Sequence, residues 1–259
     1  MSLKITNGSE TLIFGGDVKI TSFSESGFEV DNNLNAIIEG FGYNKENAAV
    51  GAKKLILKGY VEKNIETNKR LLNRICDPCV GFCKLYDGDY LLECRLLKGI
   101  EYSDKKHEKI KLLSFTAEFV CPEPVWYDAV EKSAILYSCT SSSSQSPMQI
   151  TNTGDREIGF KLQIVMIASS SKIVLSRGTK KLTLEGEFAS GGTLFIDTRK
   201  GQKGITYQKS SSSSATDAMN FVVPSSDFFT LIRGKNSIGY DFSSGSAHMI
   251  LTYKQEYFR

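Results

Sequence analysis

Short segments bounded by turns fill the second half of this chain and constrain its fold more than any other feature. Runs rich in β-branched and aromatic residues alternate there with Gly, Ser, Asn and Asp, and no helical periodicity competes with them. This spacing is typical of an antiparallel β-sandwich. The expected strands span residues 148–151, 160–167, 172–175, 181–184, 193–197, 204–207, 219–222, 229–232, 237–242 and 248–257.

The first half combines strands with one short helix. Residues 53–61 have the length and composition of a strand, and residues 66–76 place apolar side chains at helical spacing. Thr67 is the expected N-cap, and Asp77-Pro78 stops the helix. A hairpin follows around Asp87-Gly88-Asp89, and a long strand at 110–121 ends at Pro122. This order predicts a small, partly closed, β-barrel-like domain with the helix packed across its end.

Composition changes near residue 130. Residues 1–130 contain 7 serines and a net charge of −2, whereas residues 131–259 contain 23 serines and a net charge of +5. Different compositions on two sides of one point indicate two domains, expected at 1–130 and 131–259. The serine-rich stretches 138–146, 169–171 and 210–214 are expected to be solvated loops or turns. The predicted fold class is mainly β: a β-barrel-like first domain and an antiparallel β-sandwich.

Charge and hydropathy exclude several classes of protein. The whole chain has 259 residues, 41% hydrophobic content and a net charge of only +3. Basic residues occur as scattered doublets, so direct recognition of nucleic acid is not expected. No apolar run reaches the 18 or more residues of a membrane span, and no secretory signal pattern opens the chain. We therefore expect no membrane partner and no exported precursor.

Six cysteines raise the question of metal binding. Cys76, Cys79 and Cys83 include one Cys-x-x-Cys pair, which is half of a common zinc site, and Cys94 is the nearest fourth ligand. The spacing matches no standard zinc module, and no second pair follows. Reduced, mostly buried thiols are the expected state in a chain of this length. We expect neither a metal nor a cofactor.

Catalytic motifs are absent from the sequence. The two histidines are His107, expected in a solvated turn, and His248, at the start of a strand. No nucleophile elbow, zinc-protease motif, P-loop or dinucleotide-binding loop occurs. Glu185 and Glu187 could supply a glycosidase carboxylate pair, but their segment indicates the solvent side of a strand. The chain is expected not to be an enzyme.

Trp126 and Tyr127 are the most specific local aromatic feature. They follow a proline-containing segment directly after the long strand. An exposed pair of this kind could stack on sugars, but at a strand end it is more typical of a contact between domains. We predict an interdomain contact for both residues.

Several segments, taken in order, resemble the distal tail proteins of long-tailed bacteriophages. The strand 57–61, the helix ending at residues 74–78 and the hairpin are similar to that family's strand–helix–hairpin order. Residues 119–127, Phe-Val-Cys-Pro-Glu-Pro-Val-Trp-Tyr, resemble the end of its first domain. Ile150-Thr151-Asn152-Thr153-Gly154-Asp155 resembles the start of its second domain. Residues 194–198 and 231–238 resemble later strands, the last as the pattern L-x-x-G-x-N-x-I.

The resemblance implies a structural role at the tip of a phage or prophage tail. Such proteins form a ring, commonly a hexamer, in which the β-barrel-like domains surround a central channel. Their galectin-like second domains project outward and carry receptor-binding or baseplate components for host attachment. One face of the ring meets the tail tube protein, and the other meets the tail-associated tip protein. The implied location is the virion tail tip, after synthesis in the host cytoplasm.

A ring needs subunit contacts, and the longest polar excursions of the first domain are the candidates. We predict that Asn44, Lys45, Glu46 and Asn47, or Asp104 and Lys105, contact a neighbouring subunit. An alternative function remains open. The sandwich could be a carbohydrate-binding module of a tail fibre or adhesin, with Tyr207, Phe228, Phe229 and Tyr240 as a platform or as core residues.

Overall fold

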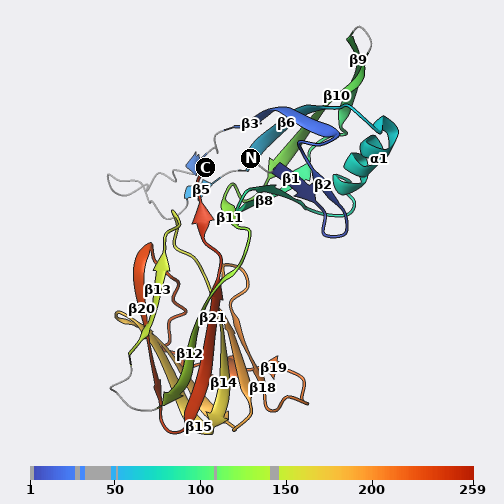
Figure 1. Cartoon of the computed structure of the whole chain (residues 1–259). Helices are drawn as coiled ribbons and strands as arrows, with labels where there is room; N and C mark the ends of the chain where they lie inside the picture. Colours follow the sequence, from blue (N-terminus) through green and yellow to red (C-terminus); the bar gives the residue numbers. More distant parts are fainter. Residues whose placement is uncertain (1–2, 27–29, 33–47, 51, 108–109, 141–145) are drawn as a thin grey trace, which may run out of the picture. The chain divides into compact units, whose positions relative to one another are not determined.

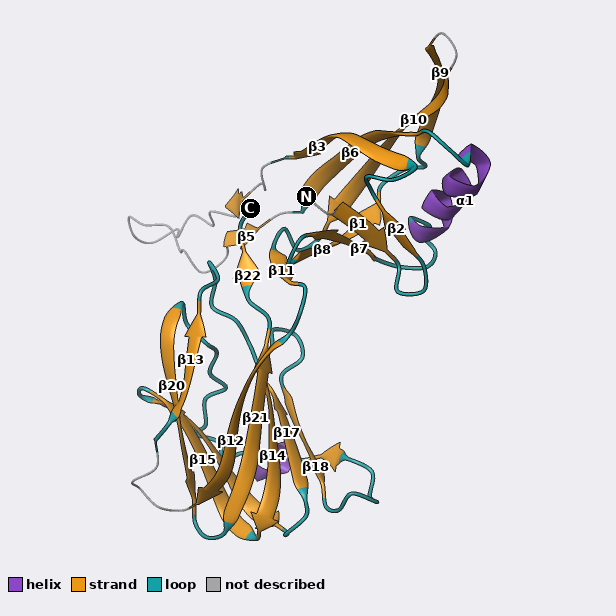
Figure 2. Cartoon of the chain, viewed as in Figure 1, coloured by secondary structure: helices purple, strands orange, loops and turns teal. Residues whose placement is uncertain are grey.

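The computed structural model describes residues 3–26, 30–32, 48–50, 52–107, 110–140 and 146–259 (Figure 1). The chain divides into two compact units. The first comprises residues 1–129 together with 258–259, and the second comprises residues 130–257. Strands dominate both units, with one α-helix in the described part of the first (Figure 2). The mainly β fold class predicted from the sequence is confirmed.

One curved sheet forms the framework of the first unit. Its strand order is β2-β1-β7-β8-β10-β6-β3, with β9 alongside β10 and β11 beside β8. A separate pair, β4 with β5, lies outside that path. The bounds are β1 Leu3–Thr6, β2 Thr11–Ile13, β3 Val18–Glu25, β4 Val30–Asn32, β5 Ala48–Val50, β6 Lys53–Val61, α1 Ile65–Ile75, β7 Cys83–Asp87, β8 Tyr90–Leu96, β9 Glu101–His107, β10 Ile110–Cys121 and β11 Trp126–Asp128.

The long strands β6 and β10 carry the core of this unit. They pair antiparallel from Leu113 opposite Val61 to Cys121 opposite Lys53. Every second residue of β10 from Leu113 to Cys121 is buried, as the period of a half-buried strand requires. β10 ends directly before Pro122, as predicted, because proline cannot donate to the ladder.

Helix α1 buries Leu72 and Ile75 and ends before Asp77, as the sequence predicted. Its expected N-cap at Thr67 is wrong, since Thr67 lies inside the helix. The chain enters the helix through Asn64, which has the left-handed backbone conformation that asparagine tolerates better than most residues. The Asn64 side chain donates a hydrogen bond to Asp17 instead of capping the helix.

The solvated turn expected at residues 103–108 is wrong, because most of this segment is a strand of a hairpin. β9 pairs with β10 from Glu101 opposite Thr116 to His107 opposite Ile110. The sequence did not indicate this strand because its residues are mostly polar. In the described part of the chain β9 pairs with β10 alone, and an edge strand of this kind can carry polar side chains on both faces. This hairpin extends beyond the rest of the first unit's sheet (Figure 1).

Two antiparallel sheets form the second unit. One has the order β12-β21-β14-β17-β18-β19, and the other has the order β13-β20-β15-β16. Side chains from both form one hydrophobic core, which includes Phe160, Phe188 and Phe229. The bounds are β12 Lys132–Thr140, β13 Met148–Asn152, β14 Lys161–Ala168, β15 Ser170–Arg177, β16 Lys180–Phe188, β17 Thr193–Asp197, β18 Gly204–Gln208, β19 Thr216–Asp217, β20 Gly234–Phe242, β21 Ser246–Tyr253 and β22 Glu256–Tyr257.

Four expectations for the second unit need correction. Ser170 and Ser171, expected in a solvated loop or turn, belong to β15, and Ser170 is buried. The strand expected at 219–222 is a short 3-10 helix, Met219–Phe221. The strand expected at 229–232 forms only an isolated bridge between Leu231 and Ile158, because this segment is part of the connection between the 3-10 helix and β20. Residues 138–140, expected in a loop, belong to β12, which pairs with β21 across a register shift. No helix in the described residues has the length and apolarity needed to cross a membrane.

Candidate functional site

Two of the motifs that suggested a family meet at buried asparagines in the second unit. Asn152, at the end of β13, is fully buried. Its Nδ2 donates to the carbonyl oxygens of Arg156 at 2.7 Å and Leu231 at 3.2 Å, and its Oδ1 accepts from the Gly154 N–H at 3.0 Å. The first motif therefore bonds directly to the backbone of the second, because Leu231 opens the later pattern.

Asn236 closes the loop of that second motif. Its Oδ1 accepts from the Ile232 N–H at 2.9 Å, while its Nδ2 donates to the Ile232 and Gly234 carbonyls at 2.8 and 3.0 Å. Gly234 has φ +91, which strongly favours glycine. Gly154 is required for another reason, since a Cβ there would lie 2.6 Å from the Glu256 carbonyl oxygen. These motif positions thus fix loop geometry.

The predicted subunit-interface residues fall in two places. Asn44, Lys45, Glu46 and Asn47 lie outside the described residues. Asp104 and Lys105 lie in β9, opposite Leu113 and Leu112 of β10. The Asp104 side chain is exposed. The role of both groups in a subunit contact stays a prediction.

Trp126 and Tyr127 belong to the first unit. Trp126 is 1% exposed, and its ring lies 6.4 Å from that of Phe23 and 5.4 Å from the Arg259 guanidinium carbon. Tyr127 is half-buried and donates its hydroxyl to Glu123. An exposed sugar-stacking pair is therefore ruled out for the tryptophan. The predicted interdomain contact stays a prediction.

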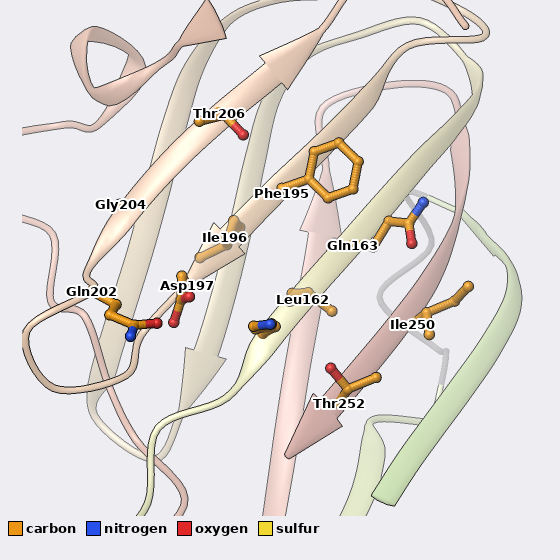
Figure 3. A pocket seen from close by; sticks show the side chains of 11 residues that line it. Leu162, Gln163, Phe195, Ile196, Asp197, Gln202, Gly204, Thr206, Ile250 and Thr252 are labelled. Carbon is orange, nitrogen blue, oxygen red and sulfur yellow. The ribbon is translucent and has the colours of Figure 1, made fainter. Parts of the chain in front are cut away.

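The outer face of the six-stranded sheet carries a pocket of about 380 Å³ (Figure 3). Cross-strand register aligns its side chains in rows. One row runs Ile135, Ile250, Gln163, Phe195, Thr206, and the next runs Ser133, Thr252, Lys161, Asp197, Gly204. Phe195 is the aromatic residue of the pocket and is 37% exposed. The first row thus offers apolar surface, and the second offers polar groups.

Asp197 and Arg199 form a fixed ion pair at one end of this pocket. Arg199 donates hydrogen bonds from Nε to Oδ1 at 3.0 Å and from Nη2 to Oδ2 at 2.6 Å, and its backbone N–H also donates to Oδ1. Burial alone would raise the pKa of Asp197, but the hydrogen bonds and charge of Arg199 lower it overall. The carboxylate is held ionised and engaged, which does not suit it to general acid catalysis.

A larger pocket of about 910 Å³ lies at an end of the sandwich where several turns meet. Its floor contains Phe188, Tyr207 and Phe221, whose rings pack edge to face with centroids 5.4 to 6.2 Å apart. Its rim is rich in hydroxyl groups from Ser169, Ser170, Ser171, Ser213, Ser214, Thr216 and Ser244. Glu187 and Lys209 also line the pocket, and Phe188 and Tyr207 are almost completely buried. The accessible lining is therefore mainly hydroxyl groups with one charge of each sign, which suits a polyhydroxy ligand.

The sequence alone does not reveal this pocket, because each serine cluster has the composition of a separate solvated loop. Alternate turns of antiparallel strands lie at the same end of a sheet, which is the signal that could have grouped them. The four aromatics named from the sequence do not form a platform. Phe229 is buried, Tyr207 is nearly so, and Phe228 and Tyr240 pack against the core.

Of the titratable residues singled out from the sequence, Cys83 and Cys94 lie together with their Sγ atoms 3.6 Å apart, whereas the glutamates and His248 lie elsewhere. Among the described side chains, no three His, Cys, Asp or Glu residues are placed to hold a metal ion. Cys76 is buried while Cys79 is exposed, so the Cys-x-x-Cys pair is split. Glu185 pairs with Lys172 at 2.8 Å. His248 accepts a hydrogen bond from the Ser138 N–H through Nδ1 at 3.1 Å.

Comparison with known proteins gives this architecture a class. The chain is similar to the crystal structure of the Dit protein of phage SPP1, described as a paradigm of the hub adsorption apparatus in phages infecting Gram-positive hosts. That likeness has a TM-score of 0.69 at 13% identity and covers 98% of this chain and 99% of that one. A chain of the phage P2 baseplate, in its activated conformation with Ca, gives a TM-score of 0.51 at 11% identity, covering 98% and 97%. The fold is that of a two-domain tail component of phages.

Residues 153–257 match the family described as the siphovirus-type tail component, C-terminal domain. That match covers most of the second unit, and the whole chain has the fold of the distal tail proteins. The resemblance drawn from the sequence is confirmed. No curated protein matches the chain by sequence.

Proposed function

We propose that this chain is the structural hub of a siphophage tail tip, with a ring of copies as its working form. The observation that carries the proposal is the family match of residues 153–257, set within a fold that is similar to a hub protein along almost the entire chain. The proposed ring is a hexamer. It joins the tail tube protein to the tail-associated tip protein and to receptor-binding or baseplate proteins.

The first unit supplies features that suit a ring. In a closed ring each copy presents two different faces to its neighbours, so the contacts are heterologous. In the described part of the chain, β9 pairs with β10 alone, and its free edge and charged side chains suit contact with another copy. We propose Asp104 and Lys105 for one side of this contact. The role requires no catalysis, and we propose that the chain is not an enzyme.

Light scattering after size exclusion, with negative-stain images of the same peak, tests the ring. The expected result is a mass of several copies and a particle with a central hole. Because rings can depend on a template, the measurement is repeated after mixing with purified tail tube protein. Monomers under both conditions, with no complex on the tube, would contradict the hub.

Deletion of residues 45–50 tests the predicted interface. The deletion should abolish rings while the monomer keeps its circular dichroism spectrum and its cooperative unfolding. Deletion of the serine stretch 210–214, in the other unit, is the matched control and should leave rings intact. Rings that survive the first deletion would exclude this segment, and the Asp104→Arg variant then tests the β9 side.

A second function is favoured by the hydroxyl-rimmed pocket. We propose that the second unit binds an oligosaccharide there, which would add host-glycan contact to the structural role. A glycan array screened with the full chain, followed by calorimetry on any ligand found, tests this. Ser171→Trp, which fills the rim, should abolish binding, whereas Thr252→Trp on the outer sheet face should not. An array without signal would exclude the glycan function and leave the hub proposal standing.

A further inference from the structure

Four buried cysteines gather inside the first unit. Cys76 lies directly after α1, Cys83 opens β7, Cys94 lies in β8 and Cys121 ends β10. Their thiols interact in sequence along the cluster: Cys76 with Cys83, Cys83 with Cys94, and Cys94 with Cys121. Buried cysteine packs as a small apolar residue, and neighbouring thiols can in addition be oxidised to a disulfide.

Cys83 and Cys94 are the pair with disulfide geometry. They are direct register partners in the antiparallel β7–β8 ladder, and their Sγ atoms lie 3.6 Å apart. Opposed residues in such a ladder have Cα atoms about 4.5 or 5.5 Å apart, within the range of about 4.4–6.8 Å that disulfides span. A bond between the two sulfurs therefore requires side-chain adjustment without separating the strands.

We propose that Cys83 and Cys94 are an oxidation site, at which a peroxide converts the two thiols into a cross-strand disulfide. The chemistry does not rest on the proposed hub function. If the chain does serve in a tail tip, the site would be reduced during assembly in cytoplasm and oxidised after release.

The reaction balances with hydrogen peroxide as the oxidant. The Cys83 thiolate attacks one peroxide oxygen, the O–O bond breaks, and hydroxide leaves, giving a sulfenic acid at Cys83. The sulfur of Cys94 then attacks the Cys83 sulfur, the S–O bond breaks, and water leaves with the Cys94 proton. Hydroxide takes up the proton that Cys83 lost at the start. Two thiols and one peroxide thus give one disulfide and two waters.

The neighbours assign different roles to the two sulfurs. Hydrogen bonds from the Cys76 and Cys94 thiols lower the pKa of Cys83 well below its ordinary value. The pKa of Cys94 is raised by its hydrogen bonds to Cys121 and Cys83 and by burial. The Cys83 Sγ lies 3.2 Å from the Cys94 carbonyl oxygen and 3.6 Å from the Cys94 Sγ, so it is the sulfur with polar partners on both sides of the pair. We assign Cys83 as the nucleophile toward peroxide and Cys94 as the resolving thiol. Cys83 and Cys94 are 2% and 0% exposed, so a small diffusible oxidant is required.

Mass spectrometry on the full chain tests the proposal, in a Cys79→Ser background that removes the exposed thiol. The protein is treated with hydrogen peroxide, quenched with catalase, unfolded and alkylated. The sequence has six cysteines, so this variant has five thiols, and oxidation should leave three to be alkylated. Peptide mapping should show one cross-link, between Cys83 and Cys94. Five alkylated thiols after treatment, or a cross-link between another pair, would overturn the proposal.

Two further variants separate the roles. With Cys76→Ser and Cys94→Ser both added, which removes the two thiols beside Cys83, a sulfenic acid should persist at Cys83 and be trapped by dimedone. Folded protein with no dimedone adduct at Cys83 would overturn its assignment as the nucleophile. With Cys139→Ser added instead, in the second unit, the cross-link should form as before. If the variant lacking Cys94 does not fold, the oxidised parent protein provides the test. Its thermal unfolding midpoint should rise by a few degrees on oxidation and return after reduction. An unchanged midpoint would contradict the proposed disulfide.

Discussion

Buried polar side chains fix the loops of the second unit. A polar side chain is stable in the protein interior only where backbone groups replace the hydrogen bonds that it made with water. Asn152 and Asn236 make three hydrogen bonds each to the backbone around them. The sequence drew attention to both positions through a family resemblance, but their physical function is visible only in the structure. An asparagine in a turn predicts a local hydrogen bond, whereas the bond from Asn152 to Leu231 spans 79 positions.

Asn236→Ala should destabilise the second unit by about 2–3 kcal/mol, because the Ile232 N–H and carbonyl lose their partners inside the protein. Urea unfolding followed by far-ultraviolet circular dichroism measures the loss. Asn220→Ala, at an exposed position, is the control and should lie within about 0.5 kcal/mol of the parent. Equal effects of the two substitutions would mean that the loop does not depend on the buried amide.

The Asp197–Arg199 pair should make the second unit sensitive to acid. Because the folded-state pKa of Asp197 is lowered, its contribution is fully present above the unfolded-state value of about 3.9 and is lost as the pH falls through the folded-state pKa. The pair is partly exposed, so the contribution is about 0.5–1 kcal/mol. Asp197→Asn should flatten the decline in unfolding free energy below pH 4, while the exposed Asp241→Asn should not. A decline of unchanged steepness in Asp197→Asn would exclude this pair as its source.

At the scale of elements, hydrophobic alternation predicted most strands, and the exceptions have physical reasons. β17 was predicted at the bounds observed, because it is a short apolar run between clear turns. β9 and most of β12 were missed because their sequences are polar or mixed. The segment at 219–222 was predicted as a strand from its apolar content, which a single 3-10 turn packed on the core also satisfies. The pockets could not be predicted, since they depend on which turns share one end of a sheet.

Gly59→Ala should disrupt the first unit through the packing of three strands. A Cβ on Gly59, in the middle of β6, would lie 2.2 Å from the Lys19 carbonyl oxygen of β3 and 2.7 Å from the Phe115 ring of β10. The backbone cannot move away without breaking a ladder, so we expect a loss of about 3 kcal/mol or more. Gly99→Ala, whose Cβ would meet open space, should be neutral. Fluorescence of Trp126, the single tryptophan, reports the unfolding, and a stable Gly59→Ala variant would contradict the packing.

At the scale of the molecule, the chain forms most of the first unit, then the whole second unit, and then returns to the first unit with its last two residues. Residues 258–259 belong with the first unit, although the second unit lies between them and the rest of it. Arg259 pairs with Asp87 at 3.4 Å and lies over the ring of Tyr90, and its carbonyl oxygen accepts from the Lys53 ammonium group at 2.8 Å. The composition shift near residue 130 gave no indication of this return.

Arg259→Ala should therefore destabilise the first unit by about 1–2 kcal/mol, through the lost ion pair and the lost cation–π contacts. Trp126 fluorescence follows the first unit alone, because the second contains no tryptophan. The calorimetric transition of the second unit should not move. Arg233→Ala, an exposed position in the second unit, is the control. A shift of the second unit's transition in Arg259→Ala would contradict the assignment of Arg259 to the first unit.

The return of residues 258–259 also sets an order of events on the ribosome. Translation runs from the first residue onward, so the partners of Lys53, Asp87 and Tyr90 emerge only after the whole second unit has been made. The second unit, which has its own core, can fold while the first still lacks Arg259. The part of the chain that is synthesised first is thus the part that is completed last.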